Sequence, residues 1–246
     1  MTIREPEFVD LPTACGPMRT QVFRPAGEGR FPGVVLFSEI FQITAPIRRT
    51  AAFLAGHGFI VAVPEVYHEF LPAGTVLAYD QPGADKGNEL KYAKPLASYD
   101  DDARAAVAFL KTHAAGNGRV GAMGICLGGH LAFRTALLPE VAATTCFYAT
   151  DLHQGSLDKG KADDSLPRCG EIKGELMMIW GRQDPHVPGE GRAKIHAALT
   201  AAGVHFTWHE FNAAHAFLRD EGLRYDAELA HLTLGMTVAF FRRALA

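Results

Sequence analysis

The sequence predicts an α/β protein built on a mostly parallel sheet with helices on both faces. Apolar runs of strand length alternate with segments of helical periodicity along the chain, and several of the runs are apolar throughout. Strands without polar alternation are buried on both faces, which is typical of parallel sheets. No linker separates two sets of such elements, so we expect a single domain over residues 1–246.

Apolar runs, together with the prolines and glycines that bound them, predict the N-terminal elements. Residues 6–25 predict two short strands around a turn, and the apolar run at 33–37 predicts a buried strand. A helix is expected to begin near Pro46, because proline suits the first helical turn, and to end at the glycines of 56–58. The run at 59–63 predicts the next buried strand.

The middle of the chain combines an irregular segment with a compact strand–turn–helix. Residues 65–97 are rich in Gly, Pro, Tyr and Lys and predict a long loop, which is more often functional than idle; whether it is a mobile lid is left open. Apolar spacing predicts a helix over 100–113. An apolar run at 120–123 predicts a strand, and a glycine-rich turn at 124–129 leads into a helix over 127–138.

The C-terminal half continues the same alternation. Three apolar runs predict strands over residues 141–148, 175–180 and 204–211. Helical patterns predict helices over 191–202 and 226–243.

The composition excludes several classes of protein. The chain has 246 residues, a length that can bury a full core. Its composition, 48% hydrophobic and 21% charged residues, is ordinary for a globular protein. The net charge of −3, with both signs interspersed, gives no basic run for nucleic acid. No apolar stretch reaches membrane length and the N-terminus lacks the layout of a signal peptide. We expect a cytoplasmic protein that binds neither nucleic acid nor a membrane.

Cysteines and histidines show no metal-binding pattern. The cysteines form no C-x-x-C pair and no zinc spacing, so we expect free thiols in a reducing compartment. His205 and His209 share a predicted strand, but four residues of strand place them about 13 Å apart, too far for one metal ion. We expect no metal and no cofactor. The four cysteines are Cys15, Cys126, Cys146 and Cys169.

The turn at 124–129 carries the most informative pattern. It has the G-x-S-x-G spacing of a nucleophile elbow, with Cys126 in the position of the serine. Such a turn holds its central residue in a strained conformation at the N-terminus of the following helix. A thiol placed there is shifted toward the nucleophilic thiolate. The alternative is a small apolar cysteine packed at a glycine-rich turn.

The later part of the chain contains a candidate acid and a candidate base. Asp184 follows the strand predicted at 175–180, and His215 follows the strand predicted at 204–211. The order nucleophile, acid, histidine, each on a loop after a strand, is that of elbow-type hydrolases. Taken alone, Asp184 is also consistent with a turn before Pro185, and His215 with a surface histidine. Their conjunction with Cys126 favours the catalytic interpretation.

The chain resembles the dienelactone hydrolase (carboxymethylenebutenolidase) family of the α/β-hydrolase superfamily. The resemblance spans residues 37–219 and implies an α/β-hydrolase fold with a Cys126–His215–Asp184 triad in a monomer or weak homodimer. The matching stretches are Phe37–Phe41, Gly124–Gly129, Gly181–Pro188 and His215–Arg219.

The resemblance also implies roles for residues that would otherwise be unremarkable. Glu39, by itself an exposed acid after a strand, would lie near the thiol and set its protonation and orientation. Backbone N–H groups of Ile40 and Leu127 would form the oxyanion hole. Arg219 would hold a substrate carboxylate.

A second substrate cation is expected from the segment after the second catalytic strand. That segment contains no arginine at the corresponding place, and Lys86 or Lys91 is the candidate substitute. This departure from the family pattern puts dienelactone itself in doubt as the substrate.

The expected activity is hydrolysis of lactone or enol-ester bonds in a small, anionic substrate, through a thioester at Cys126. One alternative is a carboxylesterase or thioesterase for substrates without a carboxylate. The other is a non-enzymatic thiol sensor, which would not require an intact acid and base.

Overall fold

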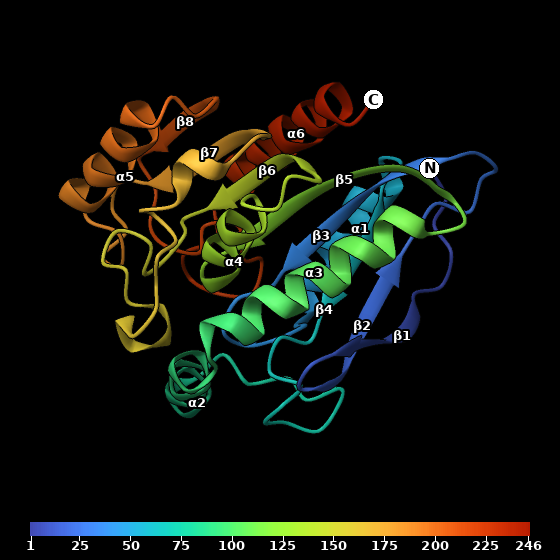
Figure 1. Cartoon of the computed structure of the whole chain (residues 1–246), viewed down its shortest axis with the longest axis horizontal. Coiled ribbons are helices and arrows are strands. Elements are labelled where there is room, and N and C mark those ends of the chain that lie inside the picture. Colours follow the sequence, from blue (N-terminus) through green and yellow to red (C-terminus); the bar gives the residue numbers. More distant parts are fainter.

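One mixed sheet organises the molecule, with strands in the order β1-β2-β4-β3-β5-β6-β7-β8 (Figure 1). The computed structural model describes residues 1–246. β1 and β2 run antiparallel to their neighbours, and the other strands are parallel. The strands are β1 (Glu7–Thr13), β2 (Gly16–Phe23), β3 (Phe31–Phe37), β4 (Ile60–Pro64), β5 (Gly116–Ile125), β6 (Val141–Phe147), β7 (Glu175–Gly181) and β8 (Phe206–Phe211).

Helices cover both faces of the sheet, as the unbroken apolar strands predict. In Figure 1, α3 and α4 lie in front of the sheet, whereas α1 and α6 lie behind it. α3 packs on β3 and β5, and α6 packs on β6 and β7. The helices are α1 (Ala45–Gly56), α2 (Gln81–Ala93), α3 (Leu96–Thr112), α4 (Leu127–Thr135), α5 (Gly189–Ala201) and α6 (Ala227–Ala244).

The prediction of an irregular segment over residues 65–97 is wrong for its second half. Residues 81–93 form helix α2, and α3 begins at Leu96 instead of residue 100. The Asp80 carboxylate caps α2 by accepting from the Gly83 N–H at 2.8 Å, and Pro82 lies in the first turn. The sequence of α2 does not predict a helix because most of its residues are polar and two are interior glycines, which disfavour helix.

A close contact explains one of these glycines. A Cβ at Gly87 would lie 2.6 Å from the carbonyl oxygen of Ile40. Helix α2 therefore rests directly on the backbone of the loop that follows β3, and only glycine permits this approach.

The remaining elements lie within a few residues of their predicted positions, and they place the carboxyl ends of the parallel strands along one edge of the sheet. Loops that follow β3, β5, β6, β7 and β8 meet there. This is the edge where open α/β sheets bind ligands. No helix in the structure combines the length and apolar character needed to cross a membrane.

Candidate active site

Cys126 lies on a sharp turn between β5 and α4. Its backbone adopts φ 62° and ψ −118°, a conformation that L-residues rarely adopt and that costs of order 1–3 kcal/mol. The turn is possible because its neighbours lack side chains: a Cβ at Gly124 would lie 1.7 Å from the Gly128 carbonyl oxygen, and one at Gly128 would lie 2.1 Å from the Phe37 carbonyl oxygen. The Cys126 N–H donates to the Phe147 carbonyl at 3.1 Å, which ties the turn to β6.

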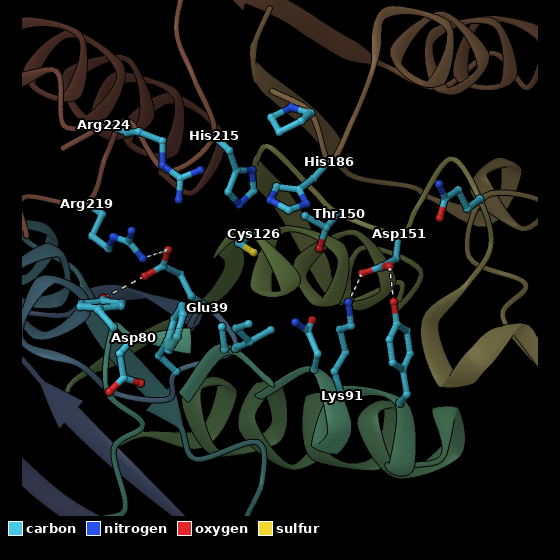
Figure 2. A pocket seen from close by; sticks show the side chains of 18 residues that line it. Glu39, Asp80, Lys91, Cys126, Thr150, Asp151, His186, His215, Arg219 and Arg224 are labelled. Carbon is cyan, nitrogen blue, oxygen red and sulfur yellow. Dashed lines mark hydrogen bonds and ion pairs between the residues drawn. The ribbon is translucent and has the colours of Figure 1, made fainter. Parts of the chain in front are cut away.

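His215 and Asp184 meet beside the cysteine. The Nδ1 of His215 lies 2.7 Å from Oδ2 of Asp184, and both side chains are buried. Oδ1 of Asp184 accepts from the backbone N–H of His186 at 2.8 Å, which fixes the carboxylate. With Nδ1 engaged, Nε2 of His215 is left to interact with Cys126, and Figure 2 shows the imidazole next to the sulfur.

The charges of these groups support one another. Burial by itself lowers the pKa of His215, but the negative charge of the Cys126 thiolate and the hydrogen bond to Asp184 outweigh it and raise the pKa to about 10. Burial raises the pKa of Asp184, but its hydrogen bond to His215 outweighs this effect and the pKa falls below its ordinary value. The arrangement favours the protonated imidazolium form of His215, held by the Asp184 carboxylate.

Glu39 is buried, in contrast to the exposed acid that its position after a strand suggests. Its Oε2 accepts from the Tyr79 hydroxyl at 2.9 Å, and its Oε1 lies 3.9 Å from Nη1 of Arg219. Burial is the largest influence and raises the pKa of Glu39 against the opposing effects of Arg219 and Tyr79. The Glu39 carboxyl therefore holds a proton at higher pH than a free glutamate does.

Two backbone N–H groups near Cys126, those of Ile40 and Leu127, donate to no backbone carbonyl. Ile40 follows Glu39 directly, and its N–H donates to no backbone carbonyl. Leu127 is the first residue of α4, so its N–H has no acceptor within the helix. Both belong to the segments that flank Cys126, and Ile40 lines the pocket.

A pocket of about 730 Å³ opens over Cys126. That volume falls within the range of small-molecule sites. Helix α2 forms one wall through residues that share a helical face, and loops after the parallel strands form the rest (Figure 2). The α2 residues in the wall are Ala84, Asn88, Lys91 and Tyr92.

The structure separates the two lysine candidates for a second substrate cation. Five residues of helix turn the chain through about 140° beyond a full turn, so Lys86 and Lys91 point in different directions. Lys91 faces the pocket, whereas the Lys86 side chain is 43% exposed and its Nζ lies 2.9 Å from Glu89 on the outside of α2. Lys86 is therefore not positioned to bind substrate, contrary to the expectation.

Arg219 lines the pocket as expected, with its guanidinium carbon 4.2 Å from the centre of the Tyr79 ring. Two further charged residues of the pocket have no sequence motif. Asp151, after β6, pairs with Lys91, and Arg224, before α6, has no ion-pair or hydrogen-bond partner. The position of Asp151 after a parallel strand is the one signal that could have found it.

Comparison with known proteins agrees with this geometry. The family model described as the dienelactone hydrolase family matches residues 18–245. The chain belongs to that family. A Saccharomyces cerevisiae protein provisionally named a carboxymethylenebutenolidase is 42% identical, over 97% of this chain and 91% of its own. The carboxymethylenebutenolidase of Pseudomonas putida is 28% identical, over 82% of this chain and 81% of its own.

Structural comparison gives the same fold. A crystal structure from Klebsiella pneumoniae, provisionally named a dienelactone hydrolase, superimposes with a TM-score of 0.84 at 22% identity and covers 99% of this chain and 100% of its own. The predicted α/β-hydrolase fold is confirmed. Membership of the dienelactone hydrolase family also confirms the prediction of a hydrolase that acts on carboxylic ester bonds.

Proposed function

We propose that this family member hydrolyses lactone or enol-ester bonds with Cys126 as nucleophile, through a thioester acyl-enzyme. The observation that carries the proposal is the placement of Cys126 and His215 in one pocket, with the 2.7 Å hydrogen bond to the buried Asp184 orienting the imidazole. A nucleophile, a base and an orienting acid in this order define the chemistry of acyl transfer.

In the first half of the reaction, the Cys126 thiolate attacks the carbonyl carbon and forms a carbon–sulfur bond. The carbonyl π electrons move onto oxygen, and the N–H groups of Ile40 and Leu127 stabilise the resulting oxyanion. When the carbonyl re-forms, the bond to the leaving oxygen breaks, and the imidazolium of His215 gives that oxygen its proton. In a lactone this step opens the ring, so the leaving group stays attached to the acyl chain.

In the second half, neutral His215 removes a proton from a water molecule as the water oxygen attacks the thioester. The tetrahedral intermediate collapses with departure of the Cys126 thiolate and release of the acid. His215 again carries its proton, and the ion pair is restored. Enolates leave readily from such intermediates because they are weakly basic, which favours enol esters and lactones over amides.

Glu39 is proposed to govern the state of the thiol before substrate binds. Its buried carboxyl lies in the pocket that also contains Cys126, and Arg219 and Tyr79 hold it in place. A buried carboxyl group with a raised pKa keeps its proton to higher pH than a free glutamate and can exchange it with a nearby base, which suits a group that sets the protonation of a neighbouring thiol.

The decisive experiment compares the wild type with Cys126→Ala and Cys126→Ser on cis- and trans-dienelactone and on 4-nitrophenyl acetate. We expect Cys126→Ala to abolish turnover of every substrate, and rapid quenching of the wild type to show a protein mass increased by one acyl group. Full esterase activity in both variants would refute the proposal. Cys126-dependent turnover of the neutral ester alone would leave the triad in place and favour a carboxylesterase.

A further inference from the structure

A buried ion pair forms part of the pocket wall. Nζ of Lys91, on α2, lies 2.9 Å from Oδ2 of Asp151, on the loop after β6. Their side chains are only 7% and 8% exposed, and both residues line the pocket. In Figure 2 this pair lies on one side of Cys126, whereas Glu39, Arg219 and Arg224 lie on the other.

Both members of the pair are charged at neutral pH. Burial lowers the pKa of Lys91, but the charge of Asp151 outweighs it and the pKa is raised. Burial raises the pKa of Asp151, but the charge of Lys91 outweighs it and the pKa is lowered. The pair therefore presents a full dipole, with no net charge, to the pocket.

Both carboxylate oxygens of Asp151 accept hydrogen bonds within the protein. Besides Lys91, the carboxylate accepts from the Tyr92 hydroxyl at 3.3 Å and from the Ser156 hydroxyl at 3.1 Å. Its backbone carbonyl also accepts from the N–H groups of residues 154–156, and its φ of 66° is that of a strained turn. Asp151 is thus a fixed acceptor that orients Lys91.

The ammonium of Lys91, by contrast, has donor capacity left. Lysine carries three N–H donors, of which Asp151 accepts one at 2.9 Å and the Tyr92 hydroxyl interacts with another. The Tyr92 ring lies on one side, with its centre 4.2 Å from Nζ. At least one N–H therefore remains for a group inside the pocket.

Stability gives no reason for a buried ion pair here, because apolar residues of similar size are commonly as stabilising. Its chemistry does suit a ligand. A neutral oxygen can accept from Lys91, but a carboxylate would be repelled by Asp151. On the other side of Cys126, Arg224 has no partner and suits an anion.

We propose that Lys91, oriented by Asp151, is a specificity-determining residue that donates a hydrogen bond to a neutral oxygen of the substrate, in a hydroxyl, ether or carbonyl group. The inference rests on the proposed ester hydrolysis and refines its substrate class. The favoured substrate carries an uncharged oxygen on this side of the scissile bond, and any carboxylate lies on the other.

The test uses pairs of esters that differ by one replacement of CH₂ by oxygen. One pair varies the acyl chain, as 4-nitrophenyl 3-methoxypropanoate and 4-nitrophenyl pentanoate. The other pair varies the alcohol, as 2-methoxyethyl acetate and butyl acetate. For each pair, the ratio of kcat/KM for the oxygen-containing ester to that for the alkyl ester is measured in each variant.

The informative variant is Lys91→Met combined with Asp151→Asn, since it removes the donor without leaving an unpaired buried charge. We expect the ratio for at least one pair to fall about tenfold, the usual effect of a hydrogen bond to a charged donor. Lys86→Met is the matched control, because it removes a lysine from the outer side of the same helix. Its ratios are expected to equal those of the wild type.

Lys91→Arg provides an independent variant that keeps the ion pair but moves the donor, and its ratio is also expected to fall. Circular dichroism establishes that each variant is folded. Cys126-dependent turnover with unchanged ratios in the double variant and in Lys91→Arg would overturn this inference alone. Turnover that does not depend on Cys126 would instead refute the proposed function.

Discussion

His215 hydrogen-bonds to Asp184 across 2.7 Å although 31 residues separate them and each follows a different strand. β7 and β8 are parallel neighbours, so the loops that leave their carboxyl ends begin side by side. The pairing therefore depends on the register of the two strands, and a hydrogen bond from the Gln183 N–H to the Ala213 carbonyl at 3.0 Å also joins the two loops.

Asp184→Asn is predicted to lower kcat by at least about a hundredfold, because the amide neither stabilises the imidazolium nor fixes its orientation. Asp184 contributes to the raised pKa of His215, so that pKa is expected to fall in the variant. Activity that depends on the imidazolium should then be lost at lower pH. The pH profile of kcat/KM measures this shift, and an unaltered alkaline limb would contradict it.

Glu39→Gln is predicted to change the pH dependence of stability. The pKa of Glu39 is raised in the folded protein, so the unfolded chain loses this proton first as pH rises. Glu39 therefore makes the wild type progressively less stable from the pKa of the unfolded chain, near 4.5, up to its higher folded value. Urea unfolding across this range should show a steeper decline for the wild type than for the variant. Parallel curves would argue against a raised pKa.

Arg224→Gln is predicted to reduce selectivity for anionic esters. Arg224 is the charged residue of the pocket without a partner, so its loss removes a binding charge without exposing another. We expect the ratio of kcat/KM for mono-4-nitrophenyl glutarate to that for 4-nitrophenyl pentanoate to fall about tenfold. Arg48→Gln, which removes an exposed arginine from α1, serves as the charge-matched control. Equal ratios in the two variants would exclude a role for Arg224.

Gly87→Ala is predicted to destabilise the protein by about 1–3 kcal/mol and to lower kcat, because the added methyl group would clash with the Ile40 carbonyl. Gly235→Ala is the matched control in α6, where no atom lies within 4 Å of the added carbon. That substitution should stabilise the protein by about 0.5–1 kcal/mol. Chemical denaturation and ester turnover measure both effects, and a fully active, equally stable Gly87→Ala protein would contradict this account.

Local patterns were sufficient for most of the fold and for the groups at the base of the pocket. An apolar run indicates the strand that ends at Ile125, directly before Cys126, and glycines indicate the turn, because the neighbouring backbone leaves no room for a side chain there. Asp184 and His215 were found because parallel strands bring their following loops to one edge. These signals need only a few consecutive residues.

Features that depend on packing between distant segments were not predictable. Helix α2 is not predicted from the sequence because it contains Gly87, a poor helix former. Glycine is required there by the close contact with Ile40. The direction in which the Lys86 side chain points depends on helix α2, so it could not be predicted without that helix. Arg224 reaches the pocket from a loop whose path is set by the rest of the chain.

The contact between Gly87 and Ile40 links access to the pocket with catalysis. Helix α2 forms a wall of the pocket, and it rests on the segment that contains Ile40, whose N–H we propose as a donor to the oxyanion. A wall that shifts to admit a bulky substrate must also shift this donor. Under the proposed mechanism, an ester too large for the pocket would therefore lose transition-state stabilisation even where it still binds, and substrate size would change the rate of the reaction.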